Sequence, residues 1–319
     1  MSSVIETRDL TKFFGSLSVV HRLNLDIPVG GIFGLLGPNG AGKSTTIKLI
    51  TGLLKPHAGT VRIFGLDPKR HRREVFARLG YLPEKPPALP GMTVSNYLAY
   101  VGQMYGIPKQ EVNQRVLETL DFVNLGKQAE QGSTKLSAGQ KQRLGLAAAL
   151  IHDPELLILD EPSANLDPVA RIQLFSKLRK LVADPSKQRT IIISSHILPE
   201  IERLADHFAI INQGTLVMEG RLQDMVADLE GVELELTIDP VDAVLALLES
   251  DPTVDKVNRL NDRQLIITVT PQNEGNLLQR LPQMVIDTQS QLISLKPVQM
   301  PIERAFLKAL GNESTWTSR

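Results

Sequence analysis

The sequence feature that most constrains this chain is a glycine-rich stretch at residues 37–45 that also carries a lysine and a serine. It reads Gly37-Pro38-Asn39-Gly40-Ala41-Gly42-Lys43-Ser44-Thr45. The apolar run before it, residues 31–36, is typical of a buried parallel strand, and residues 45–50 after it are expected to be helical. Glycines let backbone N–H groups approach a phosphate closely, and a helix N-terminus attracts negative charge. The stretch therefore predicts a phosphate-binding loop rather than an ordinary turn, with Lys43 at the outer phosphates and Ser44 offering an oxygen to magnesium.

Two further apolar segments end in polar side chains that suit catalysis. Residues 156–159 are continuously apolar and are followed by Asp160 and Glu161, and the strand predicted at 190–195 is followed by His196. Open α/β sheets bind ligands at the carboxyl ends of their strands, so these side chains are expected to meet at one edge. Asp160 is placed to hold magnesium, usually through its water shell, and Glu161 to orient or deprotonate an attacking water. His196 is directed at the same edge.

A second helix N-terminus able to hold an anion is predicted near residue 137. Ser137 suits a helix N-cap, and Gly139 keeps the first turn uncluttered before Gln140 and the Ala/Leu-rich run at 144–151. A plain capped helix is the alternative interpretation. Nearer the N-terminus, Phe13 and Phe14 are expected on a turn between strands. Phe14 is interpreted as a stacking surface for a nucleotide base, and Phe13 as a core residue.

Length and composition limit the class of protein. The chain has 319 residues, whereas single cores stop growing near about 250 to 300 residues, so two domains are expected. Lysine and arginine total 35, as do aspartate and glutamate, so the formal net charge is zero. The chain therefore has no overall positive charge to attract nucleic acid, which is not an expected partner. No cysteine occurs, which removes disulfides and thiolate metal sites and fits a reducing compartment. No apolar run reaches the roughly 18 residues of a spanning helix.

The pattern of apolar residues predicts the domain organisation. Antiparallel strands are expected at 4–8, 18–20 and 23–27, and helices at about 86–150, within an N-terminal domain of residues 1–220. A linker at 221–231 leads to a C-terminal domain at 232–311, with a last helix at 301–310 and a polar tail at 312–319. The order in that domain, β-α-β-β-α-β, predicts a small α+β split βαβ, ferredoxin-like sandwich. It contains no recognisable chemical constellation.

Together these motifs resemble the ATP-binding subunit of ABC transporters over residues 4 to about 220, which implies a P-loop NTPase, ABC-type ATPase core of the α/β class with an antiparallel β subdomain and a helical subdomain. The matching segments are Gly37 to Thr45 (Walker A), Ser137 to Gln140 (signature), Leu156 to Glu161 (Walker B with the catalytic glutamate), Ala164 to Asp167 (D-loop), His196 (switch histidine) and Phe14 (base-stacking aromatic). The C-terminal domain resembles the extension found on exporter subunits.

Two positions depart from the usual family pattern. Ala138 stands where glycine is commoner, a mild change that leaves Ser137 and Gly139 intact. Glu84 stands at the Q-loop glutamine. Its carboxylate can offer an oxygen to magnesium or water, but it adds negative charge near the triphosphate and donates no hydrogen bond unless protonated. Two roles stay open for Glu84: a metal ligand, and a reporter of nucleotide state to the permease.

The resemblance implies a mechanism and partners. Two copies form a head-to-tail homodimer in which the signature helix of one copy caps the ATP·Mg²⁺ held by Lys43 and Ser44 of the other. Glu161 acts on the water, His196 contacts the γ-phosphate, and hydrolysis drives a separate membrane permease, in the direction of export. Such a subunit is cytoplasmic and peripheral on the cytoplasmic face of the membrane.

Two other functions are weighed against this one. A soluble ABC ATPase acting on ribosomes or DNA usually has two cassettes in one chain or a long coiled-coil insertion, whereas this chain has one cassette and a short helical insert. A regulatory protein that binds ATP without hydrolysing it does not need Glu161 and His196, which are both present. The transported substrate lies beyond what these residues encode.

Overall fold

The computed structural model describes residues 3–221, 224 and 231–298. The chain divides into two compact units, Met1–Gly220 and Arg221–Arg319, and each is described by itself. The predicted helix at 301–310 and the polar tail at 312–319 lie outside the described residues, as does most of the predicted linker. No helix in the described part of the chain is both long and apolar enough to cross a membrane.

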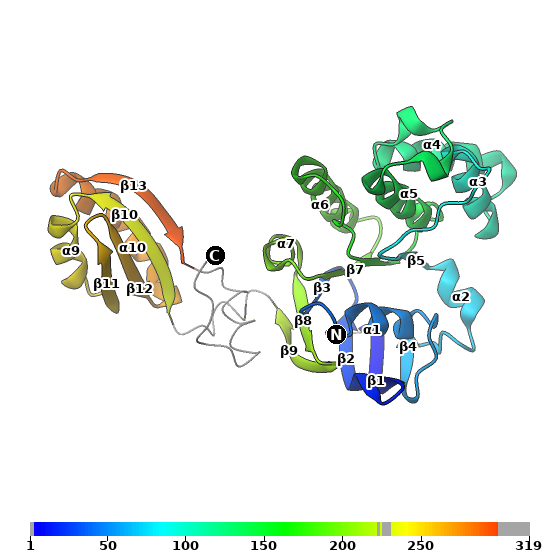
Figure 1. Cartoon of the computed structure of the whole chain (residues 1–319), viewed down its shortest axis with the longest axis horizontal. Coiled ribbons are helices and arrows are strands. Elements are labelled where there is room, and N and C mark those ends of the chain that lie inside the picture. Colours follow the sequence, from blue (N-terminus) through cyan, green and yellow to red (C-terminus); the bar gives the residue numbers. More distant parts are fainter. Residues whose placement is uncertain (1–2, 222–223, 225–230, 299–319) are drawn as a thin grey trace. The chain divides into compact units, whose positions relative to one another are not determined.

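A six-stranded sheet forms the centre of the first unit (Figure 1). In spatial order its strands are β5 (Leu79–Leu82), β6 (Leu156–Asp160), β7 (Thr190–Ser195), β3 (Gly31–Leu36), β8 (His207–Asn212) and β9 (Thr215–Arg221). The first five run parallel. Strands β6 and β7 are buried along their whole length, which explains why they have apolar runs instead of alternating patterns. Because these strands are parallel, their carboxyl ends share one edge.

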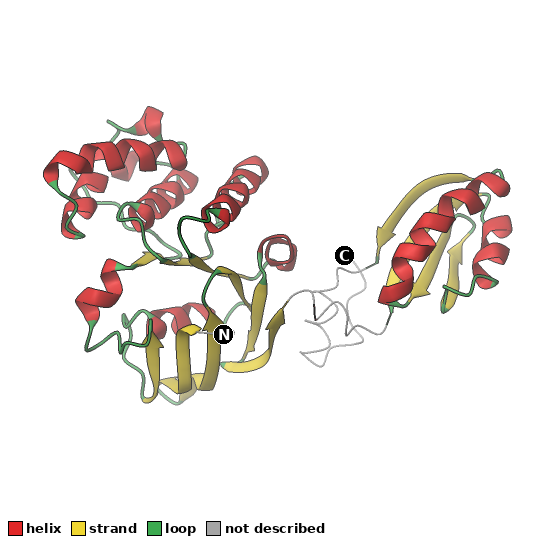
Figure 2. Ribbon diagram, turned by 180° about the vertical axis from the view of Figure 1, so that it is seen from behind, coloured by secondary structure: helices red, strands yellow, loops and turns green. Residues whose placement is uncertain are grey.

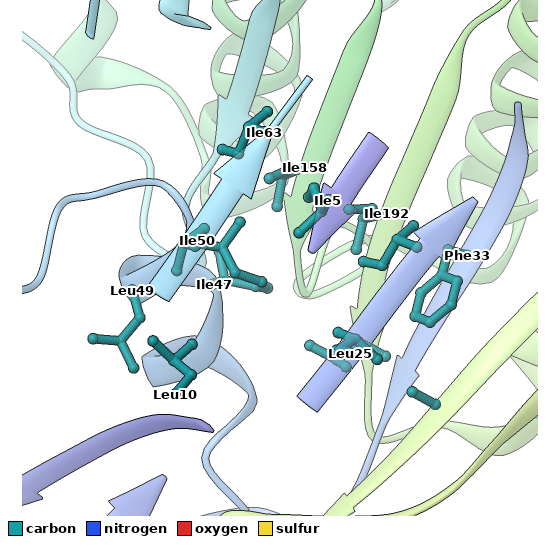
Figure 3. Close-up of a cluster of buried hydrophobic side chains, with 14 of the residues drawn as sticks. Ile5, Leu10, Leu25, Phe33, Ile47, Leu49, Ile50, Ile63, Ile158 and Ile192 are labelled. Atoms are coloured by element: carbon teal, nitrogen blue, oxygen red, sulfur yellow. The ribbon is translucent and has the colours of Figure 1, made fainter. Parts of the chain in front are cut away.

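A second, antiparallel sheet packs against the first through helix α1 (Lys43–Ile50). It consists of β2 (Leu17–Pro28), β1 (Ser3–Phe14) and β4 (Ala58–Ile63). Figure 3 shows the core between the two sheets, where Ile47 and Ile50 of α1 lie among apolar side chains from both. The phosphate-binding loop between β3 and α1 is therefore attached at both ends to buried elements.

The antiparallel sheet differs in detail from the sequence prediction. Three short strands were expected at 4–8, 18–20 and 23–27, with Phe13 and Phe14 on a turn; the structure has two twelve-residue strands, and β1 continues through Phe14 to a turn at Gly15. Register shifts between Thr7 and Leu10, together with a positive φ of 46° at Asp9, interrupt the period-two pattern. Such bulges hide a long strand from a pattern search.

The other α-helices of this unit contact the parallel sheet or one another. Helix α2 (Arg72–Ala77) precedes β5, and α3 (Val94–Met104), α4 (Lys109–Phe122) and α5 (Ala138–Leu150) pack together. Helices α6 (Pro168–Ala183) and α7 (Leu198–Leu204) lie against β3 and β7. Helix α5 also contacts β5 and β6, so the helical region is fixed to the parallel sheet on the side of the two carboxylates.

The second unit has the element order β-α-β-β-α-β. Its elements are β10 (Val232–Asp239), α9 (Asp242–Glu249), β11 (Lys256–Asn261), β12 (Gln264–Val269), α10 (Pro271–Asp287) and β13 (Gln291–Pro297). The sheet order is β11-β12-β10-β13, with every neighbouring pair antiparallel. Alternate residues of β10 face a core shared with both helices, which cover one face of the sheet in Figure 2. This arrangement is that of a split βαβ sandwich.

A mostly buried histidine follows helix α5. The ring of His152 stacks on Tyr105 at a centroid distance of 3.7 Å, and its Nε2 lies 3.2 Å from the carbonyl oxygen of Leu79. Burial lowers the pKa of His152 from 6.5 to about 4, although the bond to Leu79 acts the other way. Its Nδ1 atom is buried without a hydrogen-bond partner among the described residues. A proton added to Nδ1 would therefore remain buried and unpaired.

We expect His152 to make the folded protein less stable as the pH is lowered. Between pH 6.5 and pH 4, His152 is protonated in the unfolded chain but stays neutral in the folded chain. The stabilisation is therefore complete above pH 6.5 and is lost as the pH falls toward 4, by up to about 3 kcal/mol. Urea unfolding of His152→Phe, which keeps a ring for stacking, should show a flatter pH dependence than the wild type. The exposed His71 supplies the control His71→Gln, and equal slopes in wild type and His152→Phe would contradict the assignment.

Candidate functional site

The glycine-rich loop wraps tightly at the carboxyl end of β3. A Cβ atom on Gly37 would lie 2.2 Å from the carbonyl oxygen of Ile211, and one on Gly42, where φ is +103°, would lie 2.6 Å from that of Val19. Both contacts are too close for a side chain, so only glycine fits at these two positions. The loop ends at Gly42, directly before the first turn of α1, whose free N–H groups favour an anion.

Lys43 is drawn into this loop. Its Nζ donates hydrogen bonds to the carbonyl oxygens of Gly37 (2.7 Å) and Pro38 (3.1 Å), and its side chain is only 7% exposed. Burial lowers the pKa of Lys43, while the carboxylates of Glu161, Asp160 and Glu84 act in the opposite direction. A buried ammonium with two bonds to carbonyls is a ready partner for an anion, whose charge would offset the cost of burial.

Asp160 joins three elements at the end of β6. Its Oδ1 accepts hydrogen bonds from Ser44 Oγ of α1 (3.1 Å) and from Ser194 Oγ of β7 (2.6 Å). Its Oδ2 is buried and has no hydrogen-bond partner among the described residues. A buried carboxylate oxygen without a partner is costly unless a cation or water completes it. Together with the Ser44 hydroxyl it offers the oxygen ligands that Mg²⁺ prefers, so the residues fit this ion.

Glu161 and His196 face each other next to that carboxylate. The Nδ1 atom of His196 lies 3.0 Å from both carboxylate oxygens of Glu161, and Lys43 Nζ lies 4.0 Å from Glu161 Oε1. Glu161 has a positive φ of 50°, an uncommon conformation for a residue with a side chain. Its N–H donates to Ser194 Oγ at 3.0 Å, and its carbonyl oxygen accepts from Gln142 Nε2 at 3.2 Å. The surrounding bonds thus hold a strained backbone in place.

These groups line one cleft with a volume of about 490 Å³. The cleft is lined by Val19, Asn39, Gly40, Ala41, Gly42, Lys43, Ser44, Thr45, Glu84, Glu161, Ala164 and His196. Its size lies within the about 300–1,000 Å³ typical of small-molecule sites. The structure thus brings the predicted loop, Glu84, Glu161 and His196 to one place, with Asp160 beside them.

Other predicted site residues do not line this cleft in the same chain. Ser137 caps α5 with its hydroxyl and forms a reciprocal pair of bonds with Gln140, so its predicted N-cap is confirmed. The segment around Ser137 and Gly139 is nevertheless absent from the cleft lining, as is Phe14, which is 51% exposed. The core interpretation of Phe13 was wrong: its side chain is 38% exposed and contacts the ring of His57 by its edge. Phe13 pairs with Ser18, next to the turn that closes the β1–β2 hairpin.

Sequence analysis missed several residues around the site. Ser194 donates a hydrogen bond to Asp160, and Gln142 donates one to the carbonyl oxygen of Glu161. Val19 of β2 lines the cleft. Ser194 lies on β7, two residues before His196, and its only signal in the sequence is a hydroxyl in a buried strand. For Gln142 the signal was a polar residue, 2% exposed, on a helix.

Comparisons with known proteins identify the class. The model of the ABC transporter family matches residues 20–164. The bacitracin transport ATP-binding protein BcrA of Bacillus licheniformis is 43% identical over 221 residues, 69% of this chain and 70% of BcrA. The linearmycin resistance ATP-binding protein LnrL of Bacillus subtilis (strain 168) is 30% identical over 310 residues, 97% of this chain and 98% of LnrL. A solved ATP-binding subunit of an ABC transporter matches with a TM-score of 0.64 at 30% identity, covering 70% of this chain and 92% of that one.

The chain therefore belongs to the ABC transporter family, as an ATP-binding subunit. Its first unit is an ABC-type P-loop ATPase cassette, and its activity is ATP hydrolysis coupled to transport. The predicted family, core fold and enzyme class are confirmed.

Proposed function

We propose that this chain hydrolyses ATP in the described cleft and thereby drives export through a separate membrane permease. The observation that carries the proposal is that one cleft is lined by residues from separate elements of the fold, Lys43, Ser44, Glu161 and His196. Asp160 lies beside them and accepts a hydrogen bond from Ser44. Export is supported by the relatives, since two are named for bacitracin transport and linearmycin resistance and others for Nod factor export. The cargo is left to the permease.

The geometry suggests a role for each group. Lys43 would exchange its bonds to the loop carbonyls for bonds to the outer phosphates of ATP. Glu161, 13% exposed and next to the cleft, would orient or deprotonate the attacking water. His196 would hold the Glu161 carboxylate from one side and contact the γ-phosphate from the other. Because the transferred phosphoryl group carries spread negative charge, positioning and charge neutralisation supply most of the catalysis.

Magnesium would be held by the Ser44 hydroxyl and, directly or through water, by Asp160. When bound, the ion would neutralise charge on the phosphates. Glu84 is exposed and lines the cleft, and it is proposed to sense the nucleotide or to add an oxygen ligand. We expect Mn²⁺ to replace magnesium and to give an ATP-dependent paramagnetic signal. In Asp160→Asn the signal of the bound ion should weaken and the sharp signal of free Mn²⁺ should grow, because an amide binds the ion more weakly, and an unchanged signal would count against Asp160.

We further propose that the complete site is shared between two copies. Ser137 is exposed at the N-terminus of α5 but takes no part in the cleft of its own chain. A helix N-terminus with a serine cap is suited to hold phosphate. A head-to-tail dimer would bring Ser137, Gly139 and Gln140 of one copy onto the ATP bound by the other, and Phe14 would stack on its base.

Mixing two inactive variants tests the shared site. Lys43→Ala damages the phosphate loop, and Ser137→Arg blocks the signature end of α5. In a mixed dimer the intact loop of one copy meets the intact signature of the other. We expect ATPase activity to return on mixing, up to about a quarter of wild type, since half of the dimers are mixed and each has one good site. Two variants that stay inactive together, although they form mixed dimers, would contradict sharing.

A second candidate, a soluble ABC ATPase acting on ribosomes or DNA, has less support because the named relatives are transport and export proteins. The proposed location is the cytoplasm, at the inner face of the membrane and bound to the permease. Fractionation of cells that make the tagged full chain distinguishes the two: recovery with membranes supports the permease partner, and recovery with ribosomes supports the alternative.

A further inference from the structure

The carboxylate of Glu200 is a buried charged group to which neither the fold nor the proposed chemistry yet gives a role. Glu200 lies near the start of α7, is 6% exposed and does not line the cleft. Its Oε2 accepts hydrogen bonds from Ser163 Oγ at 2.7 Å and from Ser195 Oγ at 3.1 Å. The guanidinium of Arg171 in α6 lies 3.1 Å from its Oε1. A buried carboxylate is costly unless partners complete it. Here two hydroxyls donate to Oε2, and the Arg171 guanidinium forms an ion pair with Oε1, which accepts no hydrogen bond among the described residues.

Each serine belongs to the segment of one proposed catalytic residue. Ser195 directly precedes His196, and its Oγ also accepts a hydrogen bond from the backbone N–H of Ile197 at 3.0 Å. The backbone is therefore held on both sides of His196. Ser163 follows Glu161 by two residues, in a turn closed by a bond of 3.1 Å from Ala164 N to the Glu161 carbonyl oxygen.

Glu200 thus ties two chain segments whose working side chains must face each other. The side chain of His196 is 46% exposed, so its own packing fixes it little. Its Nδ1 nevertheless lies 3.0 Å from Glu161. Among the described residues, two groups link the Glu161 segment to the His196 segment. Ser194 of β7 accepts a hydrogen bond from the Glu161 N–H, and Glu200 of α7 accepts one from each of the two serines.

We propose that Glu200 is a positioning residue for ATP hydrolysis, which sets the distance between Glu161 and His196 through Ser163 and Ser195. The inference rests on the proposed roles of Glu161 and His196. It assigns to Glu200 no contact with ATP, and the turnover rate depends on it because small displacements of a catalytic group cost large factors in rate.

Glu200→Gln is the first test. The amide keeps the shape of the side chain, but its two ends differ: one orientation turns an NH₂ group toward Arg171, and the other turns it toward the two serines. Either way at least one contact is lost. In the purified full chain we expect kcat to fall about 10- to 100-fold, with KM and the Kd for ATP changed by less than about 2-fold. Arg203→Gln, an exposed change on the same helix, should match wild type.

Combining variants separates positioning from a general loss of structure. Ser195→Ala and Ser163→Ala each remove one hydroxyl and leave the Glu200–Arg171 pair, so they remain informative even if Glu200→Gln folds poorly. Each should lower kcat by itself. If both serines act through Glu200, neither should lower kcat further in the Glu200→Gln chain, whereas independent effects would multiply. Multiplying effects, wild-type kcat in Glu200→Gln, or a loss of ATP affinity as large as the loss of kcat would each overturn the inference.

The two levels of the proposal fail differently. An active Glu161→Gln variant would remove the proposed catalytic role and with it the reason for Glu200. An inactive Glu161→Gln variant together with a fully active Glu200→Gln variant would leave the proposed function intact and refute only the positioning role.

Discussion

Glu161→Gln is expected to lower kcat for ATP hydrolysis by about 10²- to 10⁴-fold, the usual contribution of a general base. The amide keeps the size of the side chain and its place 3.0 Å from His196, but it has no lone pair basic enough to take a proton from water. ATP binding uses the loop and Lys43, so the Kd for ATP should change little. The variant should therefore accumulate as an ATP-bound dimer, visible as a shift in size-exclusion chromatography when ATP and Mg²⁺ are added.

The comparison for this variant is Glu111→Gln, which makes the same chemical change at an exposed position of α4. It should hydrolyse ATP at the wild-type rate. Near-normal turnover in Glu161→Gln would refute the assignment of the catalytic carboxylate. A slow variant that no longer binds ATP would also count against it, because the change would then have damaged the loop.

Lys43→Ala should instead remove binding. The ammonium is buried, donates to two loop carbonyls and lies 4.0 Å from the Glu161 carboxylate, so without it the phosphates meet carbonyl dipoles and carboxylates with no cation between them. Truncating one partner of a buried charged pair costs about 2–5 kcal/mol, or about 30- to 4,000-fold in Kd. Titration with a fluorescent ATP analogue measures this loss directly.

Lys48→Ala provides the matched control, because Lys48 lies exposed on the same helix α1. Its Kd for the analogue should stay at the wild-type value. A similar loss in both variants would point to a general effect of charge near the site, and an unchanged Kd in Lys43→Ala would exclude Lys43 from the phosphates.

Much of the site could be predicted because its residues lie at the ends of buried elements. Asp160, Glu161 and His196 follow apolar runs, and parallel strands place such ends at one edge. The prediction failed where a local irregularity or a distant partner decides the outcome. Strand β1 continues through Phe14 despite register shifts along it, and Phe13 is exposed next to the hairpin turn. The spacing of apolar residues does not predict such register shifts.

The supporting residues show the same limit. Glu200 reads as an ordinary helix glutamate until the fold brings Ser163, Ser195 and Arg171 to it. Likewise, the backbone of Glu161, with its positive φ, donates a hydrogen bond to Ser194 and accepts one from Gln142, and these two residues belong to different elements. Such contacts depend on how the fold brings separate segments together, so they cannot be predicted from a single sequence.

The hydrogen bond from Gln142 to the Glu161 carbonyl oxygen bears on how two copies of the chain would coordinate ATP hydrolysis. Gln142 lies five residues after Ser137 on α5, about 7.5 Å further along a stiff rod. In the proposed dimer the N-terminus of α5 would contact the ATP bound by the partner copy, while Gln142 on the same helix bonds the Glu161 backbone of its own chain. The helix would then connect the two ATP sites mechanically. A displacement at the N-terminus of α5 would reach the other site through one continuous helix, so hydrolysis at the two sites would be coupled.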